Sequence, residues 1–234
     1  MKNTLTILST ILCIGLAEGG TITKKLELPA TDIKNFEVDC GAGFLKVEGI
    51  EGKNKIEVEA EIEISGYSVD ELDDFIEKYV ELSLNKSDNR AVLRSHIKYG
   101  KFYRGNRHIN LTIKTPLNMN LNINDGSGFT EIKNITGNLY VDDGSGELSV
   151  EKINGDVKID DGSGKISVTD IVGNVKIDDG SGVVNITNID GNVKVSDGSG
   201  SINIDKVSKD VTITESGSGG LTIRNVNGKV EKND

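Results

Sequence analysis

Five aspartates recur at a spacing of eighteen residues, and each opens an Asp-Gly-Ser-Gly phrase. If successive copies stack, their carboxylates repeat about every 4.8 Å and repel one another, and bridging calcium would relieve that repulsion. The other interpretation is an Asx-turn, in which each carboxylate accepts hydrogen bonds from the Gly and Ser amides that follow it. We favour the turn, because the Gly-Gly-x-Gly-x-Asp pattern of calcium-binding nonapeptide solenoids is absent. The aspartates are Asp125, Asp143, Asp161, Asp179 and Asp197.

The other residue types that could do chemistry form no catalytic set. Asp142 and Asp143 are adjacent carboxylates, as are their equivalents in the next two copies, but neighbours on a strand point to opposite faces. The repeat serines lack the helix that follows a nucleophile elbow, and no histidine follows His108 to act as their base. Neither His96 nor His108 has a second ligand at metal spacing. The sequence therefore predicts no catalytic residue, no metal and no cofactor.

Residues 98–108 differ in composition from the rest of the chain. They read Lys-Tyr-Gly-Lys-Phe-Tyr-Arg-Gly-Asn-Arg-His, in a protein with 4% aromatic residues and a formal charge of −10. Aromatic and arginine side chains dominate interface hot spots, so the segment is a candidate interaction loop. The other interpretation is a linker whose rings pack locally. The candidate contact residues are Tyr99, Lys101, Phe102, Tyr103, Arg104 and Arg107.

Each eighteen-residue copy contains two short stretches in which apolar and polar residues alternate. Ile166 and Val168 share one face of the first stretch, and Val175 and Ile177 share one face of the second. This alternation is typical of strands buried on one side. Across the copies, each inward position keeps its aliphatic character. Examples of such columns are Leu148, Ile166, Val184, Ile202 and Leu221, and Ile135, Ile153, Ile171, Ile189, Val207 and Val226.

Two architectures fit this spacing. Asp-Gly is a hairpin signal, so an antiparallel meander is one reading. A parallel solenoid instead places each residue under its own equivalent, which explains why the columns keep their chemistry. We therefore predict an all-β, right-handed parallel β-helix with about eighteen residues per coil. Glycine recurs after the last column, at Gly137 and its equivalents, and we expect a backbone conformation there that is costly for other residues.

The N-terminal half contains a diverged copy of the repeat. Residues 43–52 align with residues 128–137, and Cys40-Gly-Ala-Gly then stands in the place of Asp-Gly-Ser-Gly. The first coil thus starts near residue 33, and an insertion interrupts the solenoid before Leu117. We expect a strand at about 55–65, a helix opened by a Ser68-Val-Asp-Glu capping box, and a hairpin across Asp88-Asn89. The helix, whose apolar stripe is Leu72, Phe75, Ile76, Tyr79 and Val80, is expected to cover an open end or flank of the solenoid.

The N-terminus predicts export. Lys2, an apolar run from Leu5 to Leu16 and a small-residue site before Glu18 resemble a signal peptide spanning 1–17. The run is short for a membrane-spanning helix, so no transmembrane segment is expected in the mature chain. The acidic balance argues against nucleic acid as a partner. The predicted domains are the signal peptide (1–17), an N-terminal β segment (18–124) with the helix and hairpin insertion (66–98) and the loop (98–108), and the repeat solenoid (125–234).

These motifs resemble the bacterial "putative adhesin" β-strand-repeat family, a domain of unknown function in exported and envelope proteins. The resemblance rests on the Asp-Gly-Ser-Gly copies, turns such as Ile153-Asn-Gly-Asp-Val, the segment starting at Cys40 and Lys114-Thr-Pro116. It covers roughly residues 22–232 and implies a right-handed β-helix without catalytic residues.

We predict a non-enzymatic exported module, adhesin-like, that binds a protein or glycan at the cell surface or envelope. The alternatives are a structural or sensory envelope protein with a protein partner, and a calcium-stabilised repeat scaffold. Polysaccharide lyases also use right-handed β-helices, but they need a charged cleft, and only five arginines occur here, four of them before the array.

Overall fold

The computed structural model describes residues 20–66, 69–98 and 106–233. Apart from one helix, the regular structure in these residues is β-strand. The predicted signal peptide and the Ser68 cap lie outside the described residues. In the part of the chain that is described, no helix has the length and apolar character needed to cross a membrane.

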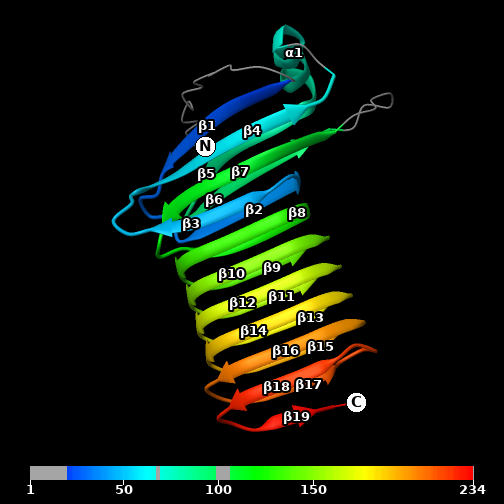
Figure 1. Cartoon of the computed structure of the whole chain (residues 1–234). Coiled ribbons are helices and arrows are strands. Elements are labelled where there is room, and N and C mark those ends of the chain that lie inside the picture. The colour runs from blue at the N-terminus through cyan, green and yellow to red at the C-terminus, as the bar shows by residue number, and fades with distance from the viewer. Residues whose placement is uncertain (1–19, 67–68, 99–105, 234) are drawn as a thin grey trace.

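The strands form two facing sheets, and within each sheet the strands are stacked one above another along the length of the molecule (Figure 1). Sheet A contains, in spatial order, β1 (Thr21–Pro29), β4 (Lys55–Ile64), β7 (Arg107–Pro116), β3 (Leu45–Ile50), the second part of β8 (Asn120–Thr136), β10 (Gly146–Asn154), β12 (Gly164–Val172), β14 (Gly182–Asp190), β16 (Gly200–Val207) and β18 (Leu221–Val226). Sheet B contains β5 (Val80–Ser87), β6 (Arg90–Ile97), β2 (Asn35–Ala42), the first part of β8, β9 (Leu139–Asp143), β11 (Val157–Asp161), β13 (Val175–Asp179), β15 (Val193–Asp197), β17 (Val211–Glu215) and β19 (Val230–Lys232).

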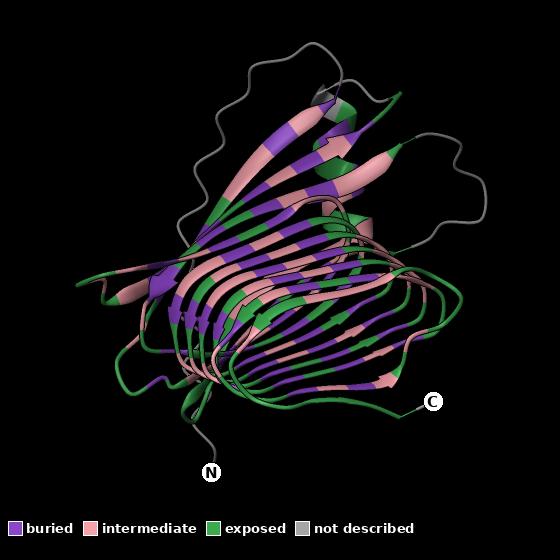
Figure 2. Ribbon diagram, turned by 60° about the horizontal axis from the view of Figure 1, so that its bottom comes forward, coloured by how far each residue is buried: buried purple, intermediate pink, exposed green. Residues whose placement is uncertain are grey.

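From β8 onward every strand pairs in parallel with its equivalent one coil away. Val157 lies beside Val175, and Ile166 beside Val184, each pair eighteen residues apart. The predicted parallel β-solenoid is therefore confirmed, and the meander is excluded. Along β9 to β16, buried residues alternate with more exposed ones (Figure 2). The predicted columns are the core: Ile166, Ile177 and Val195 are at most 1% exposed.

The predicted backbone conformation of the turn glycines is confirmed at Gly155 and Gly173, where φ is 158° and 152°. At the other equivalent positions the prediction needs correction. Gly137 and Gly191 do not have a positive φ; instead a Cβ on Gly137 would lie 2.4 Å from the carbonyl oxygen of Met119 in the coil above it. Close stacking, more than the dihedral angle, excludes side chains at these positions. In the solenoid, a column of non-glycine residues just before the last inward column has the left-handed conformation. They are Asn134, Lys152, Asp170, Asn188, Lys206 and Asn225, with φ between 53° and 60°.

The N-terminal half adds a coil that sequence analysis did not anticipate. The diverged repeat stacks as predicted, with Cys40 beside Asp125 and Val47 beside Ile132. However, β6 and β7 also join the stack, in parallel with β2 and β3. Strands β6 and β7 therefore add a coil on the far side of the first one, so part of the predicted insertion belongs to the solenoid. This coil keeps the inward aliphatic columns, with Leu111 beside Leu45, but lacks the Asp-Gly-Ser-Gly phrase.

The helix closes the N-terminal end, as expected. Helix α1 (Val69–Tyr79) contacts β1 and β5, the edge strands of the two sheets at that end (Figure 1). Leu72 and Phe75 are buried in the core, with Ile76, Tyr79 and Val80 packed against it. The predicted hairpin is confirmed as β5 paired with β6. The covered edge strands are less available for pairing with another chain.

The coil spacing can be tested at Gly164. A Cβ there would lie 1.7 Å from the carbonyl oxygen of Gly146, so Gly164→Ala should force the coils apart and lower the free energy of unfolding by about 1–3 kcal/mol or more. Gly220→Ala is the control, because its Cβ would meet only the Ser201 hydroxyl oxygen, at 3.8 Å. Urea unfolding of both variants measures the difference. Equal stability of the two would contradict the close-stacking argument.

Candidate interaction surfaces

The structure describes only one of the six predicted loop residues. Tyr99, Lys101, Phe102, Tyr103 and Arg104 lie outside the described residues. Arg107 is the first residue of β7 and pairs in antiparallel register with Ile64. The prediction of an interaction loop therefore stays a prediction, and the surface beside Arg107 is the part of it that can be described.

Arg107 lines a hollow of about 430 Å³ at the edge of sheet A. Two phenylalanines line the same hollow, Phe44 and Phe129, which occupy equivalent positions of adjacent coils. Phe129 is 36% exposed, and the Lys46 ammonium lies 5.0 Å from the centre of the Phe44 ring. Asn110 fixes the local backbone, because its side-chain oxygen accepts a hydrogen bond from the Phe44 amide at 3.1 Å.

We call Phe44, Phe129, Arg107 and Lys46 the aromatic corner. It combines exposed ring surface with cationic groups at the place where residues 98–108 return to the solenoid. Such groups are typical of binding hot spots. A signal for it was present in the sequence, since the alignment of residues 43–52 with 128–137 places phenylalanine in both copies. Exposure of the rings could not be read from that alignment.

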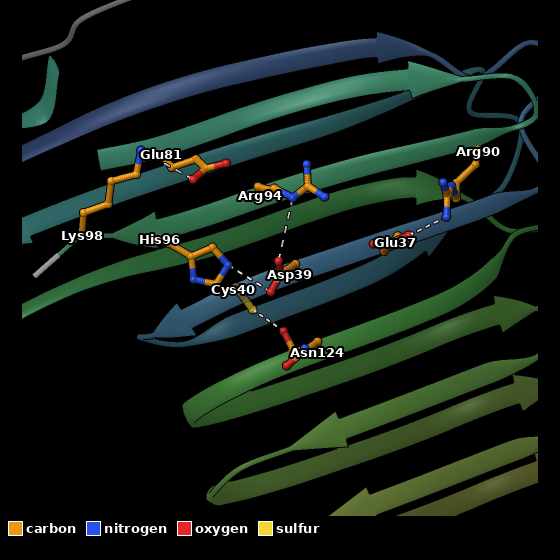
Figure 3. Close-up of polar contacts among 9 residues, drawn as sticks. All are labelled: Glu37, Asp39, Cys40, Glu81, Arg90, Arg94, His96, Lys98 and Asn124. Carbon is orange, nitrogen blue, oxygen red and sulfur yellow. Dashed lines mark hydrogen bonds and ion pairs between the residues drawn. The ribbon is translucent and has the colours of Figure 1, made fainter. Parts of the chain in front are cut away.

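A second group of side chains forms ion pairs on the outer face of sheet B (Figure 3). Asp39 lies 3.0 Å from the His96 Nε2 atom and 4.0 Å from the Arg94 Nε atom. Arg90 and Glu37 are 3.0 Å apart. These contacts join β2 to β6 across the sheet. Solvent-exposed pairs of this kind contribute about 0–1 kcal/mol each, so we interpret them as strand-pairing contacts.

Both histidines lie on the surface beside one carboxylate, as expected. His96 pairs with Asp39, and His108 lies 3.0 Å from Glu63. Within the described ranges, no group of three or more His, Cys, Asp and Glu side chains could hold a metal ion.

The repeat aspartates form a buried column inside the solenoid. Each lies in register with the next, and all are between 0% and 6% exposed. The neighbouring Asp142 and Asp178 are exposed, so the adjacent carboxylates do point to opposite faces, as predicted. We call Asp125, Asp143, Asp161, Asp179 and Asp197 the acid ladder.

The Asx-turn prediction is confirmed in part, for the serine amide and for one oxygen of three carboxylates. The glycine amides donate instead to main-chain carbonyl oxygens of the preceding coil, as Gly162 does to Asp143 at 2.9 Å. Oδ1 of Asp143, Asp161 and Asp179 accepts a hydrogen bond from the serine amide two residues on, at 3.1–3.2 Å. Oδ2 of the same three residues is buried without a hydrogen-bond partner in the described structure. Asp197 has no partner for either oxygen by the same criterion.

Asp125 differs because the first full coil provides polar partners. Thr130 donates to its Oδ2 at 2.7 Å, and the Cys40 thiol donates to its Oδ1 at 3.4 Å. In later coils the position of Thr130 is taken by an aliphatic residue, such as Leu148 or Ile166. Burial raises the pKa of the Cys40 thiol, and the nearby Asp125 carboxylate raises it further. Cys40 is therefore a neutral hydrogen-bond donor and not a nucleophile.

Burial in the acid ladder raises the pKa values of its aspartates. Burial raises the pKa of Asp143 to about 7, and the neighbouring charges of Asp125 and Asp161 add to the effect. Burial, followed by Asp161 and Asp197, raises the pKa of Asp179 to about 6. Burial likewise raises the pKa values of Asp125, Asp161 and Asp197. Ionised carboxylates one coil apart in an apolar interior disfavour one another, so part of the column is neutral near pH 7.

Comparison with known proteins places the chain beside solved structures of low sequence identity. One is a "putative adhesin" from Bacteroides fragilis NCTC 9343, with 14% identity over 91% of this chain and 96% of that chain and a TM-score of 0.47. Another is a "putative adhesin" from Parabacteroides distasonis ATCC 8503, with 15% identity, 92% and 98% coverage and a TM-score of 0.40. A third, a "putative lipid binding protein" from the same organism, has 12% identity, 91% and 97% coverage and a TM-score of 0.43.

The first two of these proteins have the description of the family that the sequence resembles. No family model matches the chain, and no curated protein matches its sequence. These names describe the other proteins, and the fold assigned to this chain rests on its own strand pairing.

The acid ladder predicts an unusual pH dependence of stability. Folded-state pKa values above the ordinary aspartate value mean that the folded protein binds more protons than the unfolded chain. Protonation of these aspartates contributes its full share to the free energy of unfolding below about pH 4, the ordinary pKa of aspartate in the unfolded chain. This contribution is lost as the pH rises through the folded-state pKa values of about 6 and about 7. The melting temperature should therefore fall between pH 5 and pH 7.5.

Asp143→Asn tests this explanation. Its side-chain oxygen can still accept the Ser145 amide, and its NH₂ group can donate to the next carboxylate, so the melting temperature at pH 7.5 should rise. Removing one unsatisfied buried group is worth about 1–3 kcal/mol, or about 2–4 °C per kcal/mol for a chain of this size. Asp142→Asn, on the exposed face of the same strand, removes only the smallest of the neighbouring charges that raise the pKa of Asp143 and should change the pH profile much less. Identical profiles for the two variants would show that the ladder does not titrate as described.

Proposed function

We propose that this chain is a non-enzymatic, exported interaction module that binds a protein or glycan partner at the cell surface or in the envelope. The observation that carries the proposal is the aromatic corner. Phe129 is exposed beside Phe44, and Arg107 lines the same hollow at the end of the predicted loop. Exposed rings beside cations on a rigid support are suited to recognition.

The solenoid supplies that support. Stacked coils hold Phe44 and Phe129 in a fixed relation, because their strands pair in register through Leu45 and Thr130. The partner would therefore meet a preorganised surface and lose little free energy to ordering. A structural or sensory envelope protein would use the same corner to engage a protein partner.

The geometry does not favour the calcium-stabilised scaffold. The carboxylates that would bridge calcium face the apolar interior, where Asp143, Asp161 and Asp179 each meet one carboxylate above and one below. Calcium takes six to eight oxygen ligands, and the residues that the structure describes contain no cluster of three candidate ligands. The buried carboxylates of the acid ladder are therefore better suited to binding protons than to coordinating a divalent cation.

Binding to isolated envelope fractions tests the proposed function. Phe44→Ala with Phe129→Ala removes the two rings that line the hollow. Phe102→Ala, Tyr103→Ala and Arg104→Ala together remove the predicted loop contacts. Each set should weaken binding of the purified chain by about tenfold or more, as expected for hot-spot residues. Val172→Ala is the control, since Val172 is 54% exposed on sheet A away from the hollow. Unchanged binding of both sets would rule out the corner and the loop as the contact.

Export is tested separately by the mature N-terminus. Cleavage after Ala17 should produce a chain that begins at Glu18, which mass spectrometry of the exported fraction would detect. Ala17→Gln should prevent cleavage at this position, because the site requires a small residue. Recovery of the chain with residues 1–17 intact in the cytoplasm would contradict the proposal of export.

A further inference from the structure

A shallow groove of about 680 Å³ runs along the outer face of sheet B. It crosses β9, β11, β13 and β15 and therefore follows the solenoid axis. Two columns of outward side chains form its walls, one rich in asparagine and the other rich in lysine. The groove is distinct from the aromatic corner, and none of its lining residues belongs to that corner.

The asparagine wall uses its oxygens internally. The Asn174 side-chain oxygen accepts hydrogen bonds from the Asn192 amide at 3.1 Å and from the Asn192 side chain at 2.9 Å. The Asp156 Oδ1 atom accepts the two equivalent bonds from Asn174, at 2.8 and 3.1 Å. An asparagine NH₂ group has two hydrogens, and these bonds use one of them. The wall therefore presents N–H donors to a ligand.

The lysine wall has two cations that are available. Lys158 is engaged: its ammonium lies 2.7 Å from the Asp160 Oδ2 atom and 4.5 Å from the centre of the Tyr140 ring. Lys176 and Lys194 are exposed, and among the described residues neither has an ion pair within 4.0 Å. The two lie in register on adjacent strands, so their stems leave the sheet about 4.8 Å apart.

The charge of the groove differs in sign from that of the chain. Its lining includes three lysines and one aspartate, Asp156, whereas the whole chain has a formal charge of −10. The next column contains Asp142, Asp160 and Asp178, which lie outside the lining of the groove. Of these, Asp160 is engaged by the Lys158 ammonium and by the Tyr140 hydroxyl, at 2.7 and 2.9 Å. The groove therefore suits an elongated ligand rich in hydrogen-bond acceptors and negative charge.

The Tyr140 ring and the aliphatic stems of the lysines add apolar surface along the same wall. Sugar rings combine an apolar face with acceptor oxygens at the rim. We propose that the groove binds a linear acidic polysaccharide, with its carboxylates at Lys176 and Lys194 and a sugar ring against Tyr140. This goes beyond the proposed function, because it assigns a second surface and the chemistry of its ligand.

Affinity electrophoresis with polygalacturonate in the gel tests the assignment. The unmodified chain should be retarded by polygalacturonate and not by dextran, which is neutral. Lys176→Gln with Lys194→Gln should weaken this binding by about tenfold, whereas Lys133→Gln with Lys165→Gln removes the same charge from sheet A and should change it less than about twofold. Retardation should also decrease as salt is added.

Tyr140→Ala separates a sugar site from a purely electrostatic one. It should weaken binding to polygalacturonate and leave any binding to linear polyphosphate unchanged. Equal effects of the two lysine pairs, equal retardation by dextran, or tighter binding to polyphosphate than to polygalacturonate would each overturn the proposal. The lysine variants retain the aromatic corner, so their envelope binding through Phe44 and Phe129 distinguishes a failure of this inference from a failure of the proposed function.

Discussion

In-register parallel stacking is the constraint on which the rest of this structure depends. Because each residue lies directly beside its equivalent in the next coil, the residue type at one position of the repeat forms a column along the solenoid axis. Aliphatic residues repeat into continuous buried columns, and glycines repeat where adjacent backbones come too close for a Cβ atom. No coil has a complete core by itself, and the stack is stable only as a continuous array.

The same constraint creates the acid ladder. An Asx-turn is a local device, and an isolated one at the surface would leave its second oxygen in water. Here the turn lies inside the coil, so the second oxygen of Asp143, Asp161 and Asp179 is enclosed and faces carboxylates one coil away. Thr130 and Cys40 donate hydrogen bonds to the two carboxylate oxygens of Asp125, so at this position the second oxygen has a donor. The later coils keep aliphatic residues there, and burial raises the pKa of Asp143 and of Asp179 instead.

On the outer surface, stacking arranges equivalent residues in columns whose neighbouring members lie next to one another. Asp156, Asn174 and Asn192 support one another from coil to coil, while Lys176 and Lys194 stand side by side facing solvent. The N-terminal end is different, because β1, β4 and α1 close it and β7 brings Arg107 to the hollow that Phe44 also lines. The molecule thus presents a periodic face and one irregular corner, and the two proposals assign different ligand contacts to them.

The sequence alone determined the repeat length, the strand positions and the inward columns, since these follow from periodicity that any single copy displays and every copy reinforces. It also determined the register between residues 43–52 and 128–137, because identical turn spacing leaves one alignment. Only the tertiary structure decided that β6 and β7 add a coil beyond β2 and β3, since that pairing joins segments without a shared motif. Tertiary structure likewise decided that the aspartates are enclosed and that Phe129 is exposed, because burial depends on what the opposite sheet and the neighbouring coil place around each side chain.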